Sequence, residues 1–181
     1  MEKTLDELLH DLDSKDDAIR KAAFDYLFTQ TEMPVNWLDD VFETLACKLT
    51  SPNSFQRNIG VMLLSNLAKS DLSGRLAAVI GPCMALLEDE KFITTRMAAQ
   101  SVWKIGAAQV DLRPQIVDGL MRTLNRSHMN PHPNLIRQDI VSSLMRLHSE
   151  APNSVDIEQI NKYIAANCAM PEKKRLMALM P

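Results

Sequence analysis

Residues 79–105, VIGPCMALLEDEKFITTRMAAQSVWKI, contain the pattern that decides the fold of this chain. An apolar stretch ends at an acidic turn around Asp89, and a second stretch follows in which Arg96 precedes Ala99 and Trp103 by three and seven residues. Residues with this spacing lie on one face of an α-helix. The segment therefore predicts two helices, and the arginine marks the beginning of the second.

The same arrangement recurs along the whole chain. Successive intervals of 37, 39, 41 and 38 residues separate Arg20, Arg57, Arg96, Arg137 and Arg175. Three residues after them come Ala23, Gly60, Ala99, Ile140 and Ala178, and seven residues after the first four come Leu27, Leu64, Trp103 and Leu144. Another apolar helical pattern precedes each arginine, so we expect two helices per unit. The residues at these offsets, Trp103 included, form a stripe along each second helix that should face the core. The small residues of the stripe should let a neighbouring helix approach closely.

The composition agrees with an all-helical chain. Hydrophobic residues make up 46% of it and aromatic residues only 5%, with 11 methionines and 5 glycines. This balance favours helix and is poor in the aromatic residues that sheets prefer. A pair of helices cannot bury its apolar face alone, so stacked pairs would have to share one core.

With Pro82 in the first helix, Asp89 in the turn and Arg96 in the second helix, residues 79–99 resemble a HEAT repeat. The arginine spacing extends the resemblance over nearly the whole chain, although the other four units lack the proline, so an armadillo-like or irregular helical repeat stays open. The resemblance implies an all-α, right-handed α-solenoid of about five HEAT-like helix-pair repeats, with nine to ten helices. We expect a single domain, 1–181, with repeats at about 1–33, 34–70, 71–110, 111–151 and 152–181.

The charge is unevenly distributed. Residues 1–50 carry 12 acidic and 5 basic groups, whereas the other 131 residues carry 11 acidic and 15 basic groups, a net charge of +4. The basic excess of residues 91–147 suggests an anionic partner but is weak beside the patches of nucleic-acid binders. No apolar run is long enough for a membrane span or placed as a signal peptide, and the cysteines form no CxxC pair. We expect a soluble cytoplasmic protein with free thiols.

No motif for catalysis, a cofactor or a metal occurs in the chain. His128 and His132 lie four apart in the long segment 125–134, but two prolines break any helix there, so we expect a surface loop without a metal. The arginine column could form a ladder for phosphates. The HEAT resemblance instead implies structural arginines that bond acidic or carbonyl groups at the turns between repeats. We therefore expect a non-enzyme that uses no cofactor.

Residues at offsets of one, four, five and eight from each arginine point away from the core stripe. In solenoids of this kind the second helices line the concave side, and the mixture of apolar, amide and hydroxyl groups suits a protein segment. The predicted partner-binding groove consists of Phe24, Phe28, Val61, Met62, Ser65, Met97, Gln100, Ser101, Lys104, Gln138, Val141 and Met145. The alternative is that the apolar members only fill gaps between helices. Trp37, at the start of a helix, could stack on a ligand or pack internally.

The expected function is the binding of a peptide or helix of another protein on the concave face, as a scaffold, adaptor or assembly factor. This expectation rests partly on analogy of fold. One alternative is nucleic-acid binding, since some HEAT-like proteins are DNA alkylation-repair glycosylases with basic, aromatic-lined channels. Against that, the basic half of this chain offers Lys104, Arg146 and few neighbours, without a second tryptophan near Trp103. An accessory subunit of an enzyme complex is a further alternative.

Overall fold

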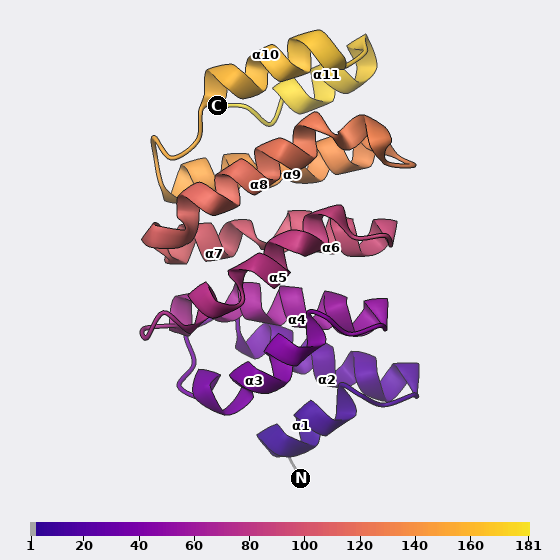
Figure 1. Ribbon diagram of the computed structural model, residues 1–181, viewed down its shortest axis with the longest axis vertical. Coiled ribbons are helices and arrows are strands. Elements are labelled where there is room, and N and C mark those ends of the chain that lie inside the picture. The colour runs from indigo at the N-terminus through magenta and orange to yellow at the C-terminus, as the bar shows by residue number, and fades with distance from the viewer. Residues whose placement is uncertain (1–2) are drawn as a thin grey trace.

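The computed structural model describes residues 3–181, which form helices and connecting turns and contain no β-strand. The helices stack along the long axis of the molecule, with the two termini at opposite ends (Figure 1). The all-α class predicted from the arginine spacing is confirmed.

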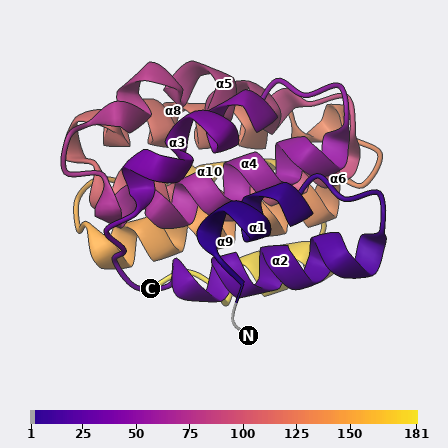
Figure 2. The same ribbon diagram turned by 90° about the horizontal axis from the view of Figure 1, so that it is seen from below.

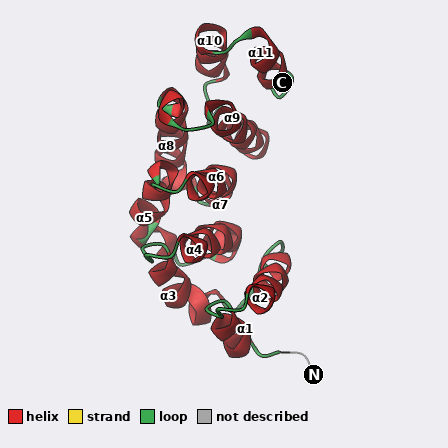
Figure 3. Ribbon diagram, turned by 90° about the vertical axis from the view of Figure 1, so that its right-hand side faces the viewer, coloured by secondary structure: helices red, strands yellow, loops and turns green. Residues whose placement is uncertain are grey.

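Two rows of helices run along the stack (Figure 3). The outer row contains α1 (Leu5–Asp11), α3 (Leu38–Lys48), α5 (Ile80–Ala85), α8 (Arg113–Asn125) and α10 (Ile157–Asn167). The inner row contains α2 (Asp17–Gln30), α4 (Ser54–Leu67), α6 (Phe92–Ser101), α7 (Trp103–Ala108), α9 (Pro133–Glu150) and α11 (Met170–Met177). The rows bend together, so that the inner row lies on the concave side (Figure 3). Seen along the stack, α3, α5 and α8 lie on one side and α2 on the other (Figure 2).

Side-chain caps define where several helices begin. The hydroxyl of Thr4 accepts a hydrogen bond from the Glu7 amide and the Glu7 carboxylate accepts one from the Thr4 amide, which together form a capping box for α1. The carboxylate of Asp16 caps α2, and the amide oxygen of Asn53 caps α4. Helix α3 begins without such a cap, because Trp37 occupies the cap position and its side chain makes no cap hydrogen bond.

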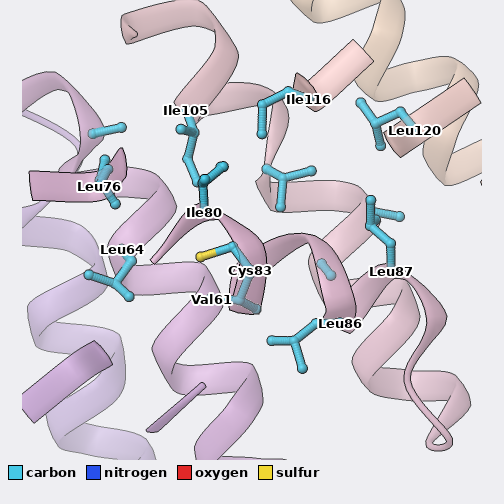
Figure 4. Close-up of a cluster of buried hydrophobic side chains, with 14 of the residues drawn as sticks. Val61, Leu64, Leu76, Ile80, Cys83, Leu86, Leu87, Ile105, Ile116 and Leu120 are labelled. Atoms are coloured by element: carbon cyan, nitrogen blue, oxygen red, sulfur yellow. The ribbon is translucent and has the colours of Figure 1, made fainter. Parts of the chain in front are cut away.

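One hydrophobic core runs through the stack, from Leu8 in α1 to Leu176 in α11. Figure 4 shows its middle, where side chains from several helices converge: Val61, Leu64, Leu76, Ile80, Cys83, Leu86, Leu87, Ile105, Ile116 and Leu120. The predicted stripe is buried at Ala23, Leu27, Leu64, Ala99, Ile140 and Leu144. Gly60 also behaves as expected, because a Cβ atom there would lie 3.1 Å from the carbonyl oxygen of Leu45 in α3. The glycine thus permits close contact between α3 and α4.

Two members of the stripe are less buried than expected, although Trp103 still packs against the core. Trp103 is half-buried rather than buried, and its indole Nε1 donates a hydrogen bond to the carbonyl oxygen of Gln100 at 3.0 Å. The inner helix is divided at Val102 into α6 and α7. The buried residues keep helical spacing across the division, at Ala98, Ala99, Val102, Ile105 and Gly106. Val102 and Ile105, on either side of Trp103, are both fully buried. Ala178, beyond the end of α11, is exposed.

The segment 125–134 is more ordered than a plain surface loop. It contains a 3-10 turn, Ser127–Met129, between α8 and α9, and the Ser127 side chain is buried there. His128 and His132 are exposed, as expected for this segment. Four other 3-10 turns, Ala68–Ser70, Arg75–Ala78, Leu86–Glu88 and Val110–Leu112, also join helices. Over residues 3–181, no helix combines the length and the apolar character needed to cross a membrane.

Candidate partner-binding surface

The arginine column mainly links neighbouring helices of the inner row. Arg57 in α4 donates two hydrogen bonds, at 2.7 and 2.8 Å, to the carboxylate of Asp89 in the turn before α6. Arg57 also bonds the carbonyl oxygen of Ser51 at 2.8 Å. Arg96 in α6 donates two bonds to Asp139 in α9. These carboxylates raise the pKa of both guanidinium groups and occupy the donors that a phosphate would need.

The column is less regular at its ends. Arg137 in α9 bonds Glu172 in α11 and the hydroxyl of Ser127, as an inter-helix link. Arg20 instead bonds its own helix entrance, at the Ser14 carbonyl and Asp17 carboxylate, while its guanidinium lies 5.2 Å from the Phe55 ring centroid. Arg175 is exposed, and its side chain forms no hydrogen bond or ion pair with another of residues 3–181. Four of the five arginines therefore make structural contacts through their side chains, and Arg175 does not.

Burial divides the twelve residues of the predicted groove. Gln138 is exposed, and seven are half-buried at the surface of the inner row: Phe24, Phe28, Met62, Met97, Gln100, Lys104 and Met145. The structure contradicts the expected accessibility of the remaining four, Val61, Ser65, Ser101 and Val141, because all are buried. Helices α4, α6 and α9 pack against inner neighbours as well as outer ones, so a wide sector of each is covered. Only a narrow strip of each central helix faces outward.

The inner face contains an apolar hollow of about 400 Å³ between α2, α4 and α6. Its wall includes four side chains with accessible apolar surface, namely Phe24, Phe55, Met62 and Met97, and the charged groups of Asp17, Arg20 and Lys21 lie at its edge. Arg20 and Lys21 form ion pairs with Asp17 and Asp25. The hollow thus combines an apolar wall with a neutralised rim, and its volume would accommodate a large apolar side chain.

Phe55 was missed from the sequence although it is the most exposed part of this wall. Its side chain is 61% exposed, which is unusual for an aromatic residue in the first turn of a helix. It precedes Arg57 by two residues, whereas the sequence pattern predicts groove residues only at positions after each arginine. The available signal was an apolar residue at position 55 directly after the Asn53-Ser54 helix start.

A line of contacts leads from the hollow toward the C-terminal part of the inner face. The rings of Phe24 and Phe28 lie 5.4 Å apart, and the Lys104 ammonium lies 5.1 Å from the centroid of the Phe28 ring. Lys104 also donates a hydrogen bond to the side-chain oxygen of Asn66, which is buried. The Asn66 amide in turn donates to the hydroxyl of Thr31 at 3.2 Å. This network holds the Lys104 ammonium beside the aromatic residues of α2.

Two more cations lie around Lys104. Lys69 follows α4 in the turn that contacts α7, and the guanidinium of Arg146 in α9 lies 5.8 Å from the Trp103 ring centroid. Burial lowers the pKa of Lys104, and the positive charges of Lys69 and then Arg146 lower it further, while Glu32 acts weakly in the opposite sense. We call Lys69, Lys104 and Arg146 the cationic cluster. None of the three forms an ion pair with a carboxylate of the described residues.

Other candidate residues do not form a site. Trp37 is half-buried and packs against the core, where it contributes to a small enclosed space with Leu9, Val41 and Leu63. Cys83 is fully buried, and burial raises the pKa of its thiol to about 12, which makes it a poor nucleophile. Within residues 3–181 no three His, Cys, Asp or Glu side chains are grouped as metal ligands.

Comparison with models of known protein families gives no match, and comparison with curated protein sequences gives none either.

Proposed function

We propose that this protein is a non-catalytic interaction module that binds a helical or extended segment of a partner protein on its concave face. The observation that carries the proposal is the apolar hollow between α2, α4 and α6, with the exposed ring of Phe55 at its edge. A scaffold, an adaptor or an assembly factor would use such a surface. A cytoplasmic location remains an expectation from the sequence.

The proposed architecture is a right-handed α-solenoid of five HEAT-like helix pairs, α1/α2, α3/α4, α5/α6–α7, α8/α9 and α10/α11. The pairing of one outer with one inner helix and the links from Arg57 to Asp89 and from Arg96 to Asp139 support it. Repeat arrays of this kind present an extended concave surface, because each unit rotates slightly relative to its neighbour. The hollow lies on that side of the molecule.

The energetic argument starts from the apolar wall of the hollow. Burying a large apolar side chain contributes about 1.5–3 kcal/mol, and Phe55 together with the partner's side chain would lose apolar exposure on binding. One such anchor corresponds to about a tenfold to hundredfold change in the dissociation constant. Recognition of this kind is typical of helix-in-groove complexes.

Nucleic-acid binding is the alternative from another class, and the distribution of charge disfavours it. Most arginines of the inner row are engaged by carboxylates: Arg20 by Asp17, Arg57 by Asp89, Arg96 by Asp139 and Arg137 by Glu172. Phosphate backbones are bound by several free cations along a track. Three of the unpaired cations of the inner face, Lys69, Lys104 and Arg146, lie in one cluster instead, while Arg175 lies apart from them in α11. An accessory role in an enzyme complex would use the same surface as the main proposal.

The test uses a displayed library of random 16-residue peptides selected on the 181-residue chain. Each selected peptide is then measured by fluorescence anisotropy against the wild type, Phe55→Glu and Leu72→Glu. Leu72 is the matched control because it is a large apolar residue, 97% exposed, in the connection between α4 and α5 and outside the hollow.

We expect selected peptides to bind the wild type and Leu72→Glu alike, and to bind Phe55→Glu at least tenfold more weakly. Circular dichroism should show equal helicity for all three proteins, because both substituted side chains are largely in solvent. The proposal fails if selection yields no binder, or if no binder distinguishes Phe55→Glu from Leu72→Glu.

A further inference from the structure

The three cations of the cationic cluster come from separate parts of the chain. Lys69 belongs to the turn after α4, Lys104 to α7 and Arg146 to α9, and α7 packs against both of the other elements. Lys69 and Arg146 are exposed, whereas Lys104 is half-buried and hydrogen-bonded to Asn66. The fold therefore gathers positive charge at one place on the inner face.

The cluster forms no ion pair with the described residues, and the Glu32 carboxylate offsets its positive charge at Lys104 only in part. The nitrogen of Lys69 donates to a neutral acceptor, the backbone carbonyl of Glu32, at 2.6 Å, and Lys104 donates to the neutral amide of Asn66. Burial is the largest cause of the lowered pKa of Lys104, and the positive charges of Lys69 and Arg146 lower that pKa further. A bound carboxylate would relieve this repulsion and would accept hydrogen bonds from the same donors.

The cluster is also continuous with the hollow. Phe24 lines the hollow, its ring stacks near Phe28, and Phe28 lies against the Lys104 ammonium. Phe24 and Phe28 are four residues apart in α2, and Met97 and Lys104 are seven apart along α6 and α7. At 1.5 Å per residue these separations correspond to about 6–11 Å. A single bound segment of two to three helical turns would cover both places.

We propose that the partner segment is acidic, and that it places an apolar side chain in the hollow and carboxylates over Lys69, Lys104 and Arg146. This inference rests on the proposed function. It specifies a helix in which a large apolar residue and at least one Asp or Glu are separated by four to seven positions. Charge complementarity selects an acidic protein segment, because the cluster is compact and the cations near the hollow are already paired with Asp17 and Asp25.

The test begins from the peptides selected on the wild-type protein, whose binding is measured against two double variants. Lys69→Gln/Arg146→Gln removes the two exposed members of the cluster and leaves the Lys104–Asn66 bond in place. The matched control, Arg122→Gln/Lys162→Gln, removes two exposed cations from α8 and α10 of the outer row. Both variants lose the same charge, so a general effect of net charge is cancelled.

We expect binders that depend on Phe55 to be enriched in Asp and Glu at the stated spacing. Their affinity should fall by up to about fivefold for each removed cluster cation, and should not change in the control. This difference should shrink between 50 and 500 mM NaCl because the charges are screened. Versions of the peptides with Gln in place of Glu should bind the wild type and the cluster variant equally. The charge-reversed variant Lys69→Glu/Arg146→Glu should bind peptides with Lys in place of Glu more tightly than the original peptides.

The inference is overturned if peptides that depend on Phe55 are not acidic, or if they bind the cluster variant as tightly as the control. In that outcome the hollow still binds peptides, so the proposed function survives. If no selected peptide bound Phe55→Glu more weakly than the wild type, the proposed function itself would be refuted. A labelled 20-nucleotide single strand and duplex are measured in parallel at 50 mM NaCl. Tighter binding of either than of the acidic peptides, lost in the cluster variant, would overturn the acidic-segment proposal in favour of nucleic acid.

Discussion

The ion pair between Arg57 and Asp89 should be a major stabilising link between the second and third helix pairs. Its side chains are only 10% and 7% exposed, and two hydrogen bonds join them. One residue earlier, Glu88 pairs with Arg126 at 3.0 Å, but these side chains are 46% and 56% exposed. The chain therefore offers a buried and an exposed arginine–carboxylate pair at adjacent positions.

The substitution Asp89→Asn keeps the shape of the side chain and removes its charge. Loss of one partner from a buried pair costs about 3–5 kcal/mol. Arg57 keeps the carbonyl oxygens of Ser51 and Pro52, at 2.8 and 3.2 Å, and water can reach the helix ends, so we expect about 2–3 kcal/mol. For a domain of this size that corresponds to a fall in Tm of roughly 4–12 °C. The control Glu88→Gln should cost about 0–1 kcal/mol.

Urea unfolding followed by circular dichroism would measure both free energies of unfolding. A double-mutant cycle with Arg57→Gln separates the interaction from other effects, because removal of both charges should cost less than the sum of the single substitutions. Equal losses for Asp89→Asn and Glu88→Gln would refute the argument that burial makes this pair important. A loss below about 0.5 kcal/mol for Asp89→Asn would refute it as well.

Three other substitutions test the packing described above. Cys83 should resist Ellman's reagent at pH 8 in the folded protein while the exposed Cys47 reacts. Burial raises the pKa of the Cys83 thiol from 9.0 to about 12. The contribution of this thiol to the free energy of unfolding is therefore complete below pH 9 and is lost as the pH rises toward 12. The substitution Cys83→Ala should lessen that alkaline decline in the free energy of unfolding. Gly60→Val should reduce the free energy of unfolding by about 1–3 kcal/mol, because the new side chain meets the α3 backbone at 3.1–3.2 Å; an unchanged urea midpoint would contradict that close contact. Val141→Glu, at a position expected from the sequence to face the partner, should lower Tm markedly because the side chain is fully buried, and a Tm equal to that of wild type would show that it is accessible.

Much of the fold could be predicted because it depends on local periodicity. The spacing of Arg20, Arg57, Arg96 and Arg137 correctly indicated four inner helices, and the residues three and seven positions later are mostly buried. Trp103 departs from this rule, because it is only half-buried while Val102 and Ile105 beside it are fully buried. How deeply a residue of the stripe is buried depends on the helices packed around it, which a repeating residue pattern does not record.

The binding surface was harder to predict. Offsets along one helix correctly placed Phe24, Met62, Met97 and Lys104 at the surface of the inner row. They also included Val61, Ser65, Ser101 and Val141, which are buried because the central helices have neighbours on more than one side. Helical periodicity identifies the face of a helix that points to the core, but not how many other helices cover the rest.

Taken alone, the sequence determined the helical class and most of the buried stripe, because these follow from the spacing of residues within about ten positions. Only the tertiary structure decided that Phe55 borders a hollow with Phe24 and Met97, and that Lys69 and Arg146 lie near enough to Lys104 for their charges to lower its pKa. Residues about 30 to 80 positions apart come together in these groups. Their proximity depends on how successive helices stack, and local sequence patterns do not encode that distance.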